Sequence, residues 1–133
     1  MTKLAEASNF SQVEYNLTGI DGTTAGASTI FTVLPGSLIF YPSYVNIRLT
    51  NVAGVVSGDL SIALGNNNPS YNNFINGVGV PLTNVGDFSS GINSPFTIVP
   101  GAAGGTDFKI NIVTPESTAT TYTLAVTIVG NYL

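Results

Sequence analysis

The sequence predicts an all-β protein: an antiparallel two-sheet sandwich, jelly-roll-like, with about eight strands. Apolar and polar residues alternate with a period of two from Ser11 onward, as they do in strands that bury one face. Turn residues separate these segments at the spacing expected of a sandwich, and no stretch after Glu6 has a helical period. Long loops in the middle of the chain favour a jelly roll over a meander.

Turn residues divide the first half of the chain into strands. Asp21-Gly22 marks a turn, and Pro35-Gly36 fits a type II turn because proline presets φ and glycine supplies a positive φ. Pro42 has no N–H to donate to a ladder, so we expect it at a sheet edge or a bulge. The expected strands span residues 11–18, 29–34, 38–41, 44–50 and 59–64.

The second half combines a polar loop, a glycine-rich segment and further strands. Gly65 to Asn76 is a loop rich in asparagine, and residues 84–94 are glycine-rich and irregular. Pro100-Gly101 and Pro115 each end the strand that precedes them. The expected strands span residues 78–83, 96–98, 108–113 and 121–128, of which the last has the clearest alternation.

A chain of 133 residues fits one domain that can bury a core without disulfides. Residues 1–10 break the strand pattern, so we interpret them as an N-terminal arm and residues 11–133 as a single β-sandwich domain. The N-terminus lacks the apolar stretch of a signal peptide, and no apolar run approaches the ~20 residues of a transmembrane helix. These features predict assembly in a cytoplasm.

The chain has few charged residues, and most of its polar residues carry hydroxyl or amide groups. Only 8% of residues are charged and the net charge is −4, whereas the chain has 16 Thr, 12 Ser and 14 Asn. Such a surface packs against a neighbour with little charge to desolvate, which favours self-assembly or assembly on a partner. The basic residues are Lys3, Arg48 and Lys109, too few for a patch that binds nucleic acid or an anionic membrane.

The sequence contains few of the residue types that act in catalysis, and we expect no catalytic, cofactor-binding or metal-ligating residues. Histidine and cysteine are absent, which removes Ser-His and Cys-His nucleophile pairs and the main zinc ligands. Asp21, Asp87 and Asp107 lie in glycine-rich segments, where we expect them to bond turn backbone. The carboxylates are too scattered for calcium, and a glycosidase pair is not evident.

The asparagine-rich loop 66–76 is the best candidate for ligand binding. Its amides, with Tyr71 or Phe74, could hold a sugar by hydrogen bonds and stacking. The alternative, which we prefer, is a surface loop whose asparagines satisfy its own turns.

The order of five segments along the chain is characteristic: ASTIFTVLPG at 27–36, VNIRLTNVAG at 45–54, LSIALGN at 60–66, SYNNF at 70–74 and TTYTLAVTIVG at 120–130. In these segments the chain resembles small virion structural proteins of tailed phages and cyanophages, especially capsid decoration (cement) proteins. The resemblance covers most of residues 11–133.

The resemblance implies a jelly-roll-like sandwich that forms a homotrimer and binds the major capsid protein without a cofactor. The expected location is the outer capsid surface of a virion assembled in the host cytoplasm. The alternative is a receptor- or carbohydrate-binding module of a tail fibre or spike. A hydrolase is disfavoured by the missing histidine and cysteine.

Overall fold

The computed structural model describes residues 12–32, 40–91 and 107–132, which form β-strands joined by turns and loops. The predicted arm 1–10, the Pro35-Gly36 turn and the strand at 96–98 lie outside these ranges. No helix long and apolar enough to cross a bilayer occurs in the described ranges. The strands are β1 (Gln12–Asp21), β2 (Gly26–Thr32), β3 (Phe40–Gly54), β4 (Ser61–Gly65), β5 (Ile75–Gly79), β6 (Phe88–Gly91), β7 (Asp107–Thr114) and β8 (Ala119–Tyr132).

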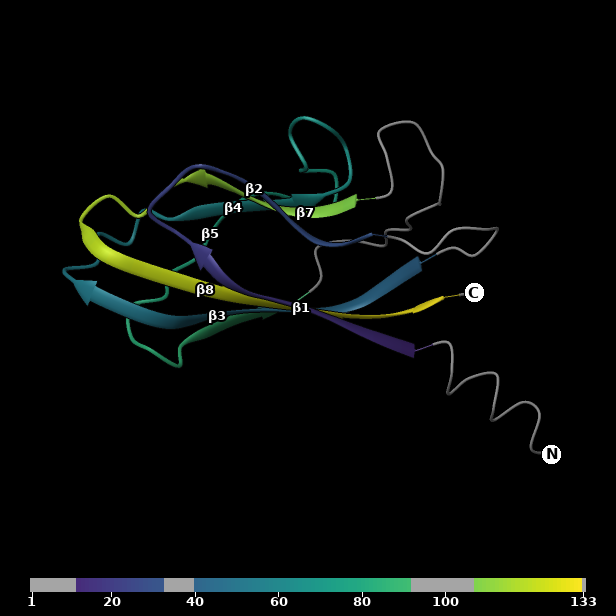
Figure 1. Ribbon diagram of the computed structural model, residues 1–133, viewed down its shortest axis with the longest axis horizontal. Helices are drawn as coiled ribbons and strands as arrows, with labels where there is room; N and C mark the ends of the chain where they lie inside the picture. The colour runs from purple at the N-terminus through teal and green to yellow at the C-terminus, as the bar shows by residue number, and fades with distance from the viewer. Residues whose placement is uncertain (1–11, 33–39, 92–106, 133) are drawn as a thin grey trace.

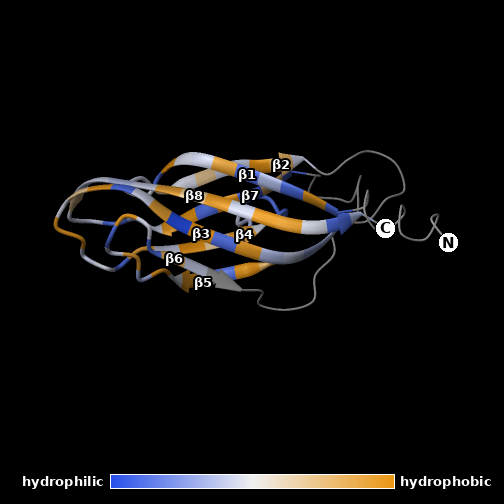
Figure 2. Ribbon diagram, turned by 90° about the horizontal axis from the view of Figure 1, so that it is seen from below, coloured by the Kyte–Doolittle hydropathy of each residue, from blue (hydrophilic) through white to orange (hydrophobic). Residues whose placement is uncertain are grey.

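The eight strands form two four-stranded antiparallel sheets, which confirms the predicted sandwich. One sheet has the order β1-β8-β3-β6 and the other the order β2-β7-β4-β5. Strands that follow one another in the chain mostly change sheets, and this order is that of a jelly roll. The two sheets lie as layers face to face (Figure 1). Strands β1 and β2 share one side of the molecule, and β5 and β6 share the other (Figure 2).

The long pairing of β3 with β8 runs through the middle of the first sheet. It extends from Phe40 opposite Tyr132 to Gly54 opposite Ala119. Alternate residues of both strands face the second sheet and are buried, as the period-two pattern predicts. A bulge separates Pro42 from Tyr44, which confirms the prediction for this proline. The core-facing residues of this pair include Val45, Ile47, Leu49, Tyr122, Leu124, Val126 and Ile128.

Aromatic rings from both sheets pack together at one end of the core. Tyr15 of β1 stacks on Phe31 of β2 with ring centroids 4.0 Å apart, and Phe31 stacks in turn on Phe108 of β7. Phe40 of β3 meets Phe31 edge-on, and its ring lies 5.1 Å from that of Tyr132. Such pairs add to the free energy of burial, so this cluster joins the two sheets.

Three predicted boundaries are wrong. The strands expected at 38–41 and 44–50 are one strand, β3, because the bulge at Pro42 lets the pairing with β8 continue. The strand expected at 78–83 is β5 at Ile75–Gly79. Residues 80–87 then cross to the other sheet, with Val80 and Leu82 buried on the way. The segment 84–94, expected to be irregular, contains β6 at Phe88–Gly91.

A hydrogen bond from one tyrosine hydroxyl connects β8 to residues 80–87, which cross between the sheets. Tyr122 is 1% exposed, and its hydroxyl donates a 2.6 Å hydrogen bond to the carbonyl of Leu82. Burial first, and then the charges of Glu116 and Asp87, raise the pKa of Tyr122 to about 12. The hydroxyl therefore stays protonated and remains a donor at neutral pH.

We expect Tyr122→Phe to lower the free energy of unfolding by about 1–3 kcal/mol, because the buried Leu82 carbonyl loses its donor. Chemical denaturation followed by circular dichroism measures this change. Tyr44→Phe is the control, since Tyr44 is 41% exposed. Equal effects of the two substitutions would contradict the assignment.

Candidate interaction surfaces

Glu116 is the most buried carboxylate of the described residues, and the structure uses it to hold two turns together. It lies between β7 and β8 and is 2% exposed. Its carboxylate accepts hydrogen bonds from the backbone N–H groups of Ser57 and Gly58, in the turn after β3. It also accepts from the N–H and hydroxyl of Thr118 and from the N–H of Ala119. Burial opposes ionisation, but these donors lower the pKa of Glu116 to about 2.

The other carboxylates are also engaged in local structure. Asp21 accepts from the N–H and hydroxyl of Thr23, and Asp87 accepts from the N–H groups of Asn84 and Thr83. These bonds lower the pKa of both aspartates and confirm the turn role predicted for them. Asp107 is the first residue of β7 and accepts from the Thr32 hydroxyl of β2, whereas the glycine-rich segment before it lies outside the described residues.

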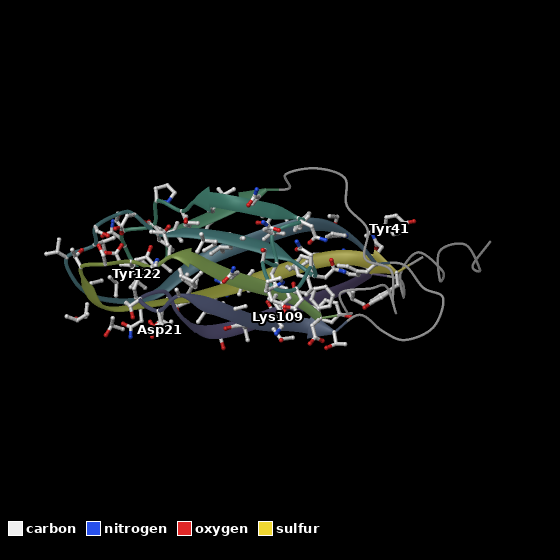
Figure 3. The ribbon with its side chains drawn as sticks, turned by 90° about the horizontal axis from the view of Figure 1, so that it is seen from above. Asp21, Tyr41, Lys109 and Tyr122 are labelled. Atoms are coloured by element: carbon white, nitrogen blue, oxygen red, sulfur yellow. The ribbon has the colours of Figure 1, made fainter. Side chains whose placement is uncertain are left out.

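No group of three His, Cys, Asp or Glu residues that could hold a metal occurs in the part of the chain that the structure describes. Asp59 accepts from the hydroxyls of Ser57 and Ser117, and these bonds lower its pKa. Asp21 and Tyr122 lie toward one end of the sandwich, Tyr41 at the other, and Lys109 between them (Figure 3). The described acids thus serve as acceptors for nearby N–H and hydroxyl groups.

The asparagine-rich loop bonds to itself. The Asn67 side-chain oxygen accepts from the N–H groups of Asn72 and Asn73, and its amide nitrogen donates to the side-chain oxygen of Asn72. Asn66 and Asn73 bond to each other through both backbone and side chain. Most of the amides proposed as sugar ligands are therefore used within the loop, which supports the preferred structural interpretation.

This loop covers part of the outer face of the second sheet. Asn111 of β7 donates to the carbonyl of Ser70, and the ammonium of Lys109 lies 4.9 Å from the ring centroid of Tyr71. Gly65 of β4 lies directly beneath Asn72 and Asn73, where a Cβ atom would collide with their backbone. Phe74 is 3% exposed and packs edge-on against Phe108. Phe74 therefore belongs to the core and is not available for stacking on a sugar.

The outer face of the first sheet is open and carries a chain of hydrogen bonds across three strands. The Arg48 guanidinium of β3 donates to the Thr127 hydroxyl of β8, which donates to Asn16 of β1. The Asn16 amide donates in turn to Glu14. One cation and one anion are thus linked through neutral side chains.

The side formed by β5, residues 80–87 and β6 carries three of the seven large apolar side chains that are exposed among the described residues. We call it the β5–β6 side. Val78, Val85 and Phe88 are exposed there, at 39%, 59% and 60%. Between residues 60 and 106 the sequence has one charged residue, Asp87, whose carboxylate caps the turn at Thr83 and Asn84.

By sequence, the chain matches no protein-family model and no curated protein. By structure, it is similar to a chain of the cyanophage Pam1 capsid asymmetric unit, with a TM-score of 0.58, 14% identity, and coverage of 92% of this chain and 83% of that one. A chain of the Ralstonia phage GP4 capsid follows, with a TM-score of 0.44, 10% identity, and coverage of 92% and 82%. The predicted resemblance to phage virion proteins is confirmed at the level of the fold.

Glu116→Gln tests the carboxylate between the turns. We expect it to lower the free energy of unfolding at pH 7 by about 2 kcal/mol, because hydrogen bonds to a charged acceptor are lost. The native pKa lies below the ~4.3 of an unfolded glutamate, so this stabilisation is present above about pH 5 and is lost as pH falls toward 2.

Urea denaturation from pH 7 to pH 2.5 measures this dependence. The wild-type protein should lose stability over that range, and the Gln variant should lack this part of the loss. Glu14→Gln is the control, since Glu14 lies exposed on β1. A Gln variant at position 116 with the same pH dependence as the wild type would contradict the assignment.

Asn67→Ala tests the asparagine-rich loop. It removes the acceptor of two backbone N–H groups, so the amides of Asn72 and Asn73 should exchange with solvent faster while those of β8 are unchanged. Hydrogen exchange followed by NMR measures the exchange rate of each backbone amide. Asn76→Ala is the matched control, since Asn76 accepts only one 3.3 Å bond from the Asn72 side chain among the described contacts. Unchanged exchange at positions 72 and 73 would show that the loop does not depend on Asn67.

Proposed function

We propose that this chain is a non-enzymatic structural protein of a phage virion, a capsid decoration protein that forms a homotrimer and binds the major capsid protein on the outer surface of the head. The observation that carries the proposal is the jelly-roll fold shared over 92% of the chain with a chain of a phage capsid asymmetric unit. No nucleic acid, membrane or cofactor takes part in the proposed binding.

The surface chemistry supports a role in binding by shape and area. Only 8% of the residues are charged, so the polar surface consists mainly of neutral hydroxyl and amide groups. Docking such a surface on a large protein lattice desolvates little charge. Many copies bound to one lattice also gain from multivalency when each copy contacts several subunits.

The carbohydrate-binding alternative loses its main support in this structure. Most of its candidate amides bond to one another, Phe74 is buried, and Tyr71 packs beside Lys109. A sugar would have to break these contacts before it could bind the loop.

Co-sedimentation with capsids tests the proposal. Purified protein is mixed with expanded heads of the encoding phage that lack it, and the heads are pelleted. We expect saturable binding at a fixed number of copies per head, and heads that resist heating better when decorated. Protein that stays in the supernatant at all concentrations, or decorated heads that are no more stable, would contradict decoration.

A further inference from the structure

We propose that Asn76 of β5 is a site of spontaneous deamidation, at which attack by the backbone nitrogen of Gly77 converts the side-chain amide into a carboxylate. The chain has 14 asparagines, and Asn76 is the only one that a glycine follows. Glycine has no side chain to obstruct the approach of its nitrogen to the preceding amide carbon, and its backbone adopts more conformations than that of any other residue. Three features of the fold favour the reaction.

The first feature is a break in the regular pairing at this position. In the pairing of β5 with β4, the two residues between Ile75 and Val78 lie opposite a single residue, Ala63. These two residues are Asn76 and Gly77, and Gly77 has a positive φ of 62°. Such a register shift disrupts the ladder locally, so regular pairing does not fix the segment in which the new bond forms.

The second feature is the access of solvent. The second sheet has the order β2-β7-β4-β5, so β5 forms its edge on the β5–β6 side among the described strands (Figure 2). Asn76 and Gly77 are both exposed. Solvent therefore reaches the pair, and the reaction requires both base and water.

The third feature is that the Asn76 amide is held more loosely than the amides of the loop before it. Its oxygen accepts one hydrogen bond, 3.3 Å long, from the Asn72 side chain. Its nitrogen, which is the leaving group, has no hydrogen bond among the described contacts. By contrast, the Asn67 side chain makes three bonds of 2.7, 2.8 and 3.0 Å to Asn72 and Asn73. The Asn76 side chain can therefore rotate until its amide carbon meets the nitrogen of Gly77.

The chemistry consumes one water and releases one ammonia. Hydroxide removes the proton from the Gly77 nitrogen, which then forms a bond to Cγ of Asn76. The bond from Cγ to Nδ2 breaks, and Nδ2 takes a proton from water and leaves as ammonia. Water then opens the five-membered succinimide at either of its two carbonyl groups. One opening gives aspartate, and the other gives isoaspartate, in which the backbone runs through the side-chain carbon.

The product places a charge on a strand that has none. β5 contains no charged residue, and the reaction makes the net charge of −4 one unit more negative. A charge on an edge strand discourages its pairing with the edge of another sheet. Deamidation at Asn76 therefore produces an aged form of the protein in which the β5 edge is charged.

Peptide mapping of the folded protein tests the proposal. The wild type is incubated at pH 8.5 and 37 °C, with circular dichroism to show that it stays folded. It is then digested with pepsin at acid pH, where succinimide formation is suppressed. Cleavage after Phe74 and Leu82 gives a peptide in which Asn76 is the single asparagine. We expect this peptide to gain the mass difference between NH2 and OH before any other asparagine does, and to separate into aspartate and isoaspartate forms.

Asn76→Gln should abolish this mass gain, because attack on the longer side chain requires a six-membered ring that forms far more slowly. Asn84→Gln is the matched control and should keep the gain, since Asn84 is exposed in the turn before β6 but is followed by valine. Reaction at residue 76 in urea-unfolded protein but not in folded protein would overturn the proposal, because the fold would then protect the amide. Faster reaction at another asparagine of the folded protein would also overturn it.

Discussion

The antiparallel pairing of β3 with β8 is the constraint on which the rest of this structure depends. Both strands are long, and both have neighbours on their other edges, so every strand of the first sheet takes its register from this pair. A shift by one residue would turn the buried face of β8 to solvent. The bulge at Pro42 absorbs a proline that would otherwise interrupt the ladder, and the pairing continues to Tyr132.

Most of the described acidic side chains accept hydrogen bonds that stabilise turns. Glu116 joins the turn after β3 to the turn before β8, and thereby fixes the end of the central pair where Gly54 lies opposite Ala119. Asp21 and Asp87 each cap a turn at the edge of the first sheet. Glu14, Arg48 and Lys109 remain as charged groups on the faces of the sheets, and most of the other polar side chains are neutral hydroxyls and amides.

Much of the fold could be predicted from the sequence, because alternation reports directly on strands with one buried face. The strands at 121–128 and 108–113 are predictable for this reason, and the bulge at Pro42 is predictable because proline lacks an N–H. Short edge strands such as β5 and β6 have little buried face, so their boundaries were missed. For the candidate site, the self-bonding of the loop asparagines was expected from turn chemistry. The role of Glu116 and the burial of Phe74 depend on contacts distant in sequence, and no local pattern reveals these.

The asparagine-rich loop has a consequence for the conditions that the protein tolerates. Its shape depends on hydrogen bonds between neutral amides, which neither gain nor lose protons in the ordinary range. Dissolved ions screen interactions between charges, but they have little effect on hydrogen bonds between neutral groups. The loop should therefore keep one conformation from dilute fresh water to concentrated brine, and from mild acid to mild alkali.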